Sequence, residues 1–272
     1  MHHAKPIYLT QFLPQIQLLK SQKPFYTNLY SYTPSAYLAK STPSSLLLLK
    51  EERQLVRVYF CTHNLCELES LITELTHTKP LCIEILQKQP TITLHSLKPH
   101  ALYLHLRKTL QPTPTLEKSP PMFATISPKT LRKLLLKDFS PITDHLPSIQ
   151  TLQSHYQAGH ILSVRSSSMI ESYLLFTHTG KSAYLNFIAN HANKQSLLRL
   201  WKMFYQKLNT LEVKFLHLWC DTTNTKALNM YHKENFSADG LKNYIYIKSS
   251  QVSGGGGINN PDYTPIFPIK VA

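Results

Sequence analysis

Glycine is scarce in this sequence: the 272 residues include only seven, and four of these are consecutive, at 254–257. Gly180 and Gly240 stand alone and are candidate turn residues, because glycine adopts positive φ at no steric cost. The consecutive run differs so much from the rest of the composition that it predicts a flexible, engineered linker at 251–257.

Cysteine pairs, long apolar runs and metal-binding motifs are also missing. The four cysteines are scattered without a CxxC pair, which favours a reducing compartment. No apolar run approaches the eighteen or so residues of a membrane span, and the first residues contain no signal-peptide pattern. We therefore expect a cytoplasmic protein. The fourteen histidines form no zinc motif, and no metal site is predicted.

Acidic residues are outnumbered: 15 Asp and Glu face 29 Lys and Arg, giving a formal net charge of +14. Such a balance suggests an acidic partner, either nucleic acid, an anionic membrane surface or an acidic protein. The basic residues are spread along the chain, however, and no nucleic-acid-binding signature accompanies them. Diffuse charge of this kind is more typical of solubility than of a site.

Proline marks the domain boundary. The segment 111–121, QPTPTLEKSPP, predicts a linker between an N-terminal half at 1–110 and a larger domain at 122–250. The N-terminal half has the order strand, helix, strand, strand, which indicates a smaller α/β unit. These elements are expected at 55–60, 65–75, 81–86 and 101–106.

The sequence of the second domain predicts a longer series of helices and strands. Ser127 is a candidate helix N-cap with Pro128 at the first helical position, and a further helix follows at 147–158. Thr179-Gly180 is a candidate hairpin turn. The strands are expected at 160–164, 172–177, 183–188, 215–219 and 244–247, with a helix at 197–208. A mixed α/β fold, with helices flanking a sheet, accounts for this order.

The segment Phe215–Tyr246 carries a family resemblance. An apolar strand precedes Asn224, a candidate cap, and a helix with Ala227 and Tyr231 on one face, ending near Phe236. This order and spacing resemble the C-terminal half of the GNAT acyltransferases, and residues 122–250 match the family's element order. The N-terminal half resembles the degenerate first half of tandem members.

The resemblance implies where chemistry would lie. By this resemblance, Asn224 would help to hold the acyl-CoA arm or an ordered water, and Tyr231 would protonate the departing CoA thiolate, as the matching tyrosine often does in the family. The matching pyrophosphate loop is 189–198, with His191, Lys194 and Ser196 at the pattern positions, and it contains no glycine. The alternative is a purely structural role, with Asn224 only a helix cap and Tyr231 only a helix residue packed on the sheet. Glu171 and Asp221 are the nearby candidates for the family's general base, each more simply explained as a solvated turn charge or a helix cap.

The C-terminal residues 258–272, INNPDYTPIFPIKVA, predict an extended peptide tethered by the glycine run, derived from a protein partner. Its expected anchors are Tyr263, Ile266 and Phe267. Two functions follow: a non-catalytic GNAT-fold adaptor that captures a partner segment and needs no cofactor, or an active N-acyltransferase using acetyl-CoA or another acyl-CoA. A third hypothesis is a tRNA partner, because 197–208 resembles a helix of the Fem-like aminoacyl transferases.

Overall fold

The computed structural model describes residues 7–30, 36–111, 126–167 and 169–250. The predicted linker at 111–121, apart from Gln111, lies outside the described residues, as do the glycine-rich segment 251–257 and the peptide 258–272 with its three anchors.

Contacts divide the chain into two compact units. Within the described residues, the first unit comprises 7–102 and 241–250, and the second comprises 103–240. These units divide inside two strands, so that Tyr103–Thr109 pairs in the second unit and Leu241–Lys248 belongs to the first.

The first unit is a sheet in the order β1-β3-β4-β5-β6-β12. All neighbouring strands are antiparallel except β5 and β6, which are parallel. Its elements are β1 (Ile7–Tyr8), a 3-10 turn (Leu9–Phe12), α1 (Leu13–Ser21), β2 (Tyr26–Thr27), β3 (Ala36–Ser41), β4 (Ser45–Glu51), β5 (Val56–Thr62), α2 (Leu65–Glu74), β6 (Leu81–Gln87) and the end of β12 (Ser237–Lys248).

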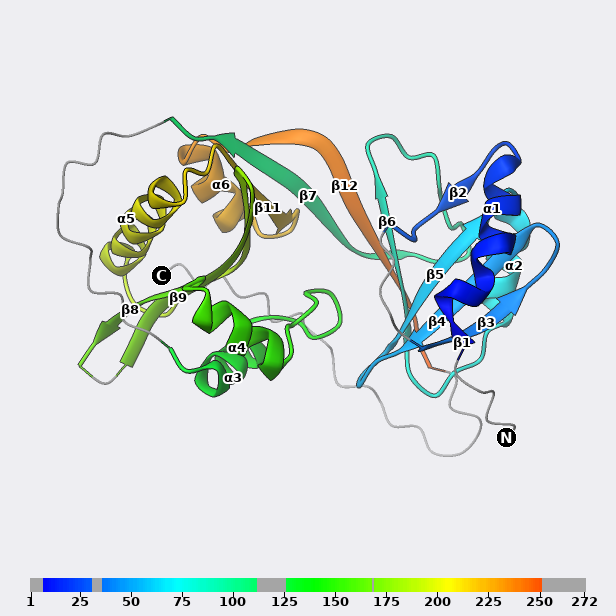
Figure 1. Ribbon diagram of the computed structural model, residues 1–272, viewed down its shortest axis with the longest axis horizontal. Coiled ribbons are helices and arrows are strands. Elements are labelled where there is room, and N and C mark those ends of the chain that lie inside the picture. The colour runs from blue at the N-terminus through cyan, green and yellow to red at the C-terminus, as the bar shows by residue number, and fades with distance from the viewer. Residues whose placement is uncertain (1–6, 31–35, 112–125, 168, 251–272) are drawn as a thin grey trace. The chain divides into compact units, whose positions relative to one another are not determined.

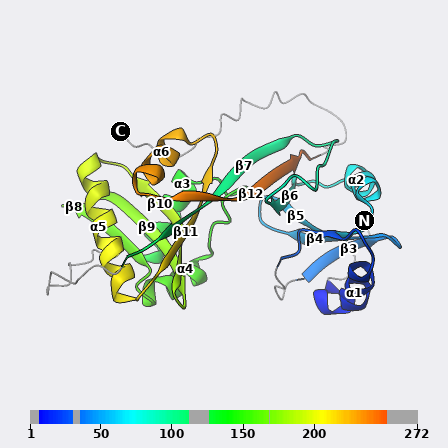
Figure 2. The same cartoon turned by 90° about the horizontal axis from the view of Figure 1, so that it is seen from above.

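The leucine side chains of β4 pack on both faces of this sheet. Leu47 and Leu49 join the core under α2, whereas Leu46 and Leu48 join the core under α1, as expected from the alternation of side chains along a strand. Figure 2 shows the two helices on opposite sides of the strands. A continuous apolar run is therefore a strand buried on both faces.

The second unit has the order β8-β9-β10-β11-β7. Only β10 and β11 are parallel among these pairs. The elements are β7 (Pro99–Thr109), α3 (Pro128–Asp138), α4 (Ile149–Gln157), β8 (Ile161–Ser166), β9 (Met169–Thr179), β10 (Ser182–Asn190), α5 (Lys194–Thr210), β11 (Phe215–Asp221), α6 (Thr225–Lys233) and the start of β12.

Helices cover both faces of the second sheet. Leu174 and Phe176 of β9 pack in the core with α5 and α6, whereas Tyr173 and Leu175 pack in a second core with α3. In Figure 1, α5 and α6 lie on one side of the strands and α3 and α4 on the other. The predicted mixed α/β architecture is confirmed.

Local signals account for much of this structure. The Ser127 side chain caps α3, with Pro128 in its first turn, and Gly180 turns the hairpin between β9 and β10 at φ 57°. The helix α1 was not predicted, because residues 1–50 show no long clean period. Among the described residues, none of the helices combines the length and apolar character that crossing a membrane would require.

Candidate functional site

The parallel strands β10 and β11 pair only along their first halves. They pair from Ser182 opposite Phe215 to Leu185 opposite Leu218, and a bulge in β10 follows Leu185. Because a bulge bends its strand, the two strands continue separately, to Asn190 and Asp221. Both end residues are buried, and among the described residues Asn190 Oδ1 and Asp221 Oδ2 have no hydrogen-bond partner. Unpaired buried polar atoms are costly and mark a candidate site.

The loop that follows β10 does not bring its predicted phosphate ligands together. Asn193 caps α5 by accepting from the Ser196 backbone N–H at 3.0 Å, and the Ser196 hydroxyl lies 3.0 Å from that of buried Ser172. His191 instead contacts the carboxylate of Asp138, with Nε2 to Oδ2 at 2.9 Å. Lys194 is exposed at the first helical position. The Asn193 side chain thus occupies a donor that a bound phosphate would need.

The two predicted catalytic residues occupy structural positions on α6. Asn224 is the N-cap and accepts from the Ala227 N–H at 3.1 Å. Tyr231 lies in the apolar core, with its ring centroid 6.4 Å from that of Trp201 and 5.5 Å from that of Phe236. Burial raises the pKa of Tyr231, with a smaller contribution from Cys220. The core position of Tyr231 is compatible with a packing role, and the hydrogen bond of Asn224 is compatible with a capping role.

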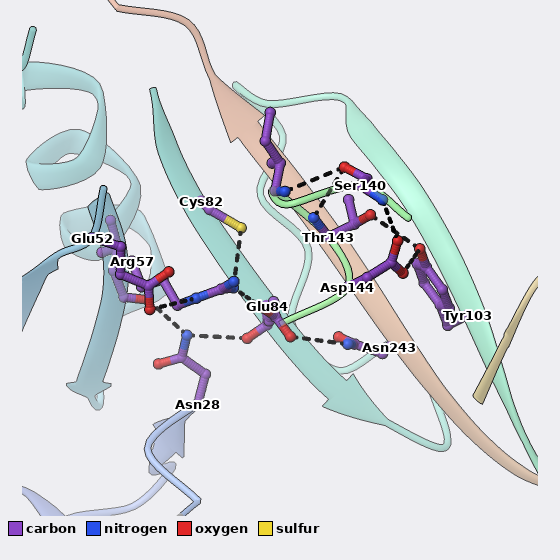
Figure 3. Close-up of polar contacts among 12 residues, drawn as sticks. Asn28, Glu52, Arg57, Cys82, Glu84, Tyr103, Ser140, Thr143, Asp144 and Asn243 are labelled. Atoms are coloured by element: carbon purple, nitrogen blue, oxygen red, sulfur yellow. Dashed lines mark hydrogen bonds and ion pairs between the residues drawn. The ribbon is translucent and has the colours of Figure 1, made fainter. Parts of the chain in front are cut away.

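An acidic cluster formed by buried Asp221 with half-buried Asp144 and Tyr103 lies beside the end of β11. Tyr103 of β7 pairs with Asp221, and its hydroxyl donates to Asp144 Oδ1 at 3.0 Å and lies 3.1 Å from the Thr143 hydroxyl. Figure 3 shows Tyr103 pointing toward Thr143 and Asp144. It also shows Ser140, whose N–H donates to Asp144 Oδ2 at 2.7 Å. Asp144 comes from the loop between α3 and α4, so three segments of the chain supply this acidic cluster.

Burial raises the pKa values of two members of the acidic cluster, Asp144 and Tyr103. Desolvation is the main cause that raises the pKa of Asp144, and the charge of Asp221 adds to it. The pKa of Tyr103 is also raised, first by burial and then by the charge of Asp144. Asp221 Oδ1 accepts from the N–H and the hydroxyl of Thr223, both at 2.7 Å, which confirms its predicted turn role for one oxygen only.

Sequence reasoning found Asp221 but not Asp144 or Tyr103. Asp144 lies in a loop where aspartate is an ordinary turn residue, and no spacing relates it to Asp221. Tyr103 was assigned to a strand of the N-terminal half. Only the pairing of β7 with β11 places it opposite Asp221.

A row of rings crosses the same strands. Tyr184 of β10 stacks on His217 of β11 at 4.9 Å, and His217 stacks on His105 of β7 at 5.3 Å. His105 Nδ1 lies 2.8 Å from the Asp239 carboxylate. Burial lowers the pKa of His217, and His105 lowers it further. This ring row begins at half-exposed Tyr184 and ends at a carboxylate.

The acidic cluster can accept a hydrogen bond from a cationic amine, because Asp221 Oδ2 has no partner among the described residues. Within the described ranges, no three His, Cys, Asp or Glu side chains are grouped so as to hold a metal ion.

Comparison with known proteins gives a similarity of structure and not of sequence. No family model and no curated protein matches the chain. A GNAT-family acetyltransferase from Colwellia psychrerythraea is similar over 90% of this chain and 99% of its own, at 9% identity and a TM-score of 0.51.

Two further solved structures show weaker similarity. A GCN5-related N-acetyltransferase from Sphaerobacter thermophilus covers 76% of each chain at 13% identity, with a TM-score of 0.48. A tandem GNAT protein from the clavulanic acid biosynthesis pathway covers 79% of this chain and 82% of its own at 10% identity, with a TM-score of 0.45. At 9% identity the similarity to the Colwellia psychrerythraea protein concerns the fold alone, and it confirms the predicted fold class: the chain has a GNAT-like mixed α/β fold.

Proposed function

We propose that this protein is a non-catalytic GNAT-fold adaptor that binds a segment of a partner protein within a larger complex. The observation that carries the proposal is the first turn of α5. Ser196 is buried against Ser172, and its N–H is taken by the Asn193 side chain. A pyrophosphate needs several converging backbone N–H groups and close approach, which this turn opposes because it has no glycine and its Ser196 N–H is already bound.

The proposed partner segment has the chemistry of residues 258–272: extended, with three prolines and with the apolar anchors Tyr263, Ile266 and Phe267. A flexible tether raises the local concentration of such a peptide to roughly millimolar, so that even a weak complex would be populated. Three prolines argue against a long added strand, because proline donates no ladder hydrogen bond, and a groove suits the segment better.

The test is to end the chain after Ser253 and to titrate a synthetic peptide of residues 258–272 by calorimetry. We expect measurable binding that Phe267→Ala in the peptide weakens. A matched control is Asn260→Ala, which removes a polar side chain outside the anchors. Absence of binding by the wild-type peptide, with the truncated chain still folded, would contradict this partner.

A second candidate is an N-acyltransferase that transfers an acyl group from acetyl-CoA or another acyl-CoA to an amine. The acidic cluster favours it, because Asp144 is a half-buried carboxyl with a raised pKa, which is suited to proton transfer. A thiol-release assay with acetyl-CoA and a panel of amines separates the candidates. Turnover that Asp144→Asn reduces by about 10²-fold would support the enzyme and contradict the adaptor.

The proposed location is the cytoplasm. The four cysteines are free, three of them buried and only Cys66 exposed, as suits a reducing compartment. A tRNA partner stays a third hypothesis, which rests on the net charge of +14.

A further inference from the structure

The first unit also contains a parallel strand pair that separates. β5 and β6 pair at Val56 opposite Leu81 and at Arg57 opposite Cys82. Both strands then continue for several residues, to Thr62 and Gln87. Along this stretch the backbone groups that face the partner strand require other hydrogen bonds, because buried N–H and C=O groups are rarely left unpaired.

The chain's own residues 26–30 supply those hydrogen bonds. On the β5 side, β2 pairs Tyr26 with Thr62 and Thr27 with Cys61, and the Thr27 hydroxyl donates to the Phe60 carbonyl at 2.7 Å. On the β6 side, the Tyr30 hydroxyl accepts from the Leu86 N–H at 2.9 Å and donates to the Leu86 carbonyl at 3.3 Å.

Asn28 joins the two strands. Its Nδ2 donates to the Val58 carbonyl of β5 at 2.9 Å and to the Glu84 carbonyl of β6 at 3.0 Å. Its Oδ1 accepts from the Phe60 N–H at 2.7 Å. Figure 3 shows the Asn28 side chain reaching toward Glu84. The side chain is 4% exposed, so these bonds lie in the interior. A side-chain amide, with its donors and acceptor, thus replaces the backbone amide of a missing strand.

We propose that the gap between β5 and β6 is a binding site for an extended, amide-bearing chain, and that residues 26–30 occupy it permanently as an internal ligand. The first unit is therefore closed to external ligands of this chemical class, including the amide-bearing arm of an acyl-CoA. The inference concerns the first unit alone and does not rest on the function proposed for the second.

Site-resolved hydrogen exchange of the full chain tests the proposal. In Asn28→Ala, we expect the Phe60 amide to exchange at least about tenfold faster, because its acceptor is gone, while Leu86 keeps its rate. In Tyr30→Phe, we expect the reverse pattern. Ile85, which pairs with Tyr244 of β12, is the control amide and should keep its rate in both variants. Unchanged exchange of Phe60 in Asn28→Ala would overturn the proposal.

A second experiment, with added ligand, tests whether residues 26–30 occupy the gap permanently. With millimolar acetyl-CoA added to the wild-type chain, Phe60 and Leu86 should keep their exchange rates. A change at these two amides would show that an external ligand displaces residues 26–30, which would also overturn the proposal. A change confined to Ser196 in the second unit would instead contradict the adaptor function and leave this inference intact.

Discussion

Replacing Asp221 by Asn should stabilise the protein, although the residue is 6% exposed and makes two hydrogen bonds. An asparagine Oδ1 can retain both bonds from Thr223. The change removes the charge of an oxygen that has no partner within the described residues, and it removes the repulsion that this charge exerts on Asp144. Residues kept for binding or chemistry often cost stability in this way.

The magnitude follows from the unpaired atom. An unsatisfied buried polar group costs about 1–3 kcal/mol, and a charged one costs more. The new amide group is also buried, but it carries no net charge, so it recovers only part of this cost. We expect the free energy of unfolding to rise by about 1–2 kcal/mol, which raises Tm by roughly 2–8 °C. Denaturant unfolding followed by far-UV circular dichroism measures it directly.

Asp138→Asn is the matched control, because Asp138 is 4% exposed and its Oδ2 is paired. Its Oδ2 accepts from the Tyr173 hydroxyl at 2.7 Å and contacts His191 Nε2 at 2.9 Å. Loss of that charge should lower the free energy of unfolding by about 1 kcal/mol or more. If Asp221→Asn destabilises the protein as much as Asp138→Asn does, Asp221 is a structural residue and the candidate site loses its basis.

Further tests concern Tyr231, His217 and the stacking of the ring row. If the protein is an adaptor, Tyr231→Phe should leave partner binding unchanged and alter the free energy of unfolding by at most about 1 kcal/mol, whereas loss of a general acid would cost turnover roughly 10²-fold. Burial and His105 lower the pKa of His217, so the unfolded chain binds more protons than the folded chain. The free energy of unfolding should therefore fall as pH drops below about 6.5. Tm measured from pH 5 to 8 should depend less on pH in His217→Phe than in the wild type, and an identical slope would refute the assignment. Some slope should persist, because burial also lowers the pKa of His155 and His160. Tyr184→Ala removes the exposed end of the ring row and should change the His217 pKa measured by NMR, whereas exposed Phe215→Ala on β11 should not.

The sequence predicted most elements of the second unit, because their signals are local. The helix caps at Ser127 and Asn224 and the hairpin at Gly180 depend on residues within a few positions of each other. The pairing of β7 with β11 could not be predicted in this way. Tyr103 and Asp221 are distant in sequence, and the alternating pattern of a strand does not specify its neighbour.

The candidate site was harder to predict for the same reason. The loop pattern predicts roles for His191, Lys194 and Ser196 from their spacing alone, and spacing does not reveal that His191 pairs with Asp138 and Ser196 with Ser172. Asn28 carried no signal at all, because a lone asparagine near prolines reads as a turn residue until β5 and β6 are seen to separate.

The most direct test of the central claim is calorimetry of the full chain with acetyl-CoA. Because the first turn of α5 lacks glycine and its Ser196 N–H is already bound by Asn193, we predict no binding tighter than about a millimolar dissociation constant, roughly −4 kcal/mol. Micromolar binding that Lys194→Ala weakens would show that this turn does hold the cofactor, and it would contradict the adaptor function.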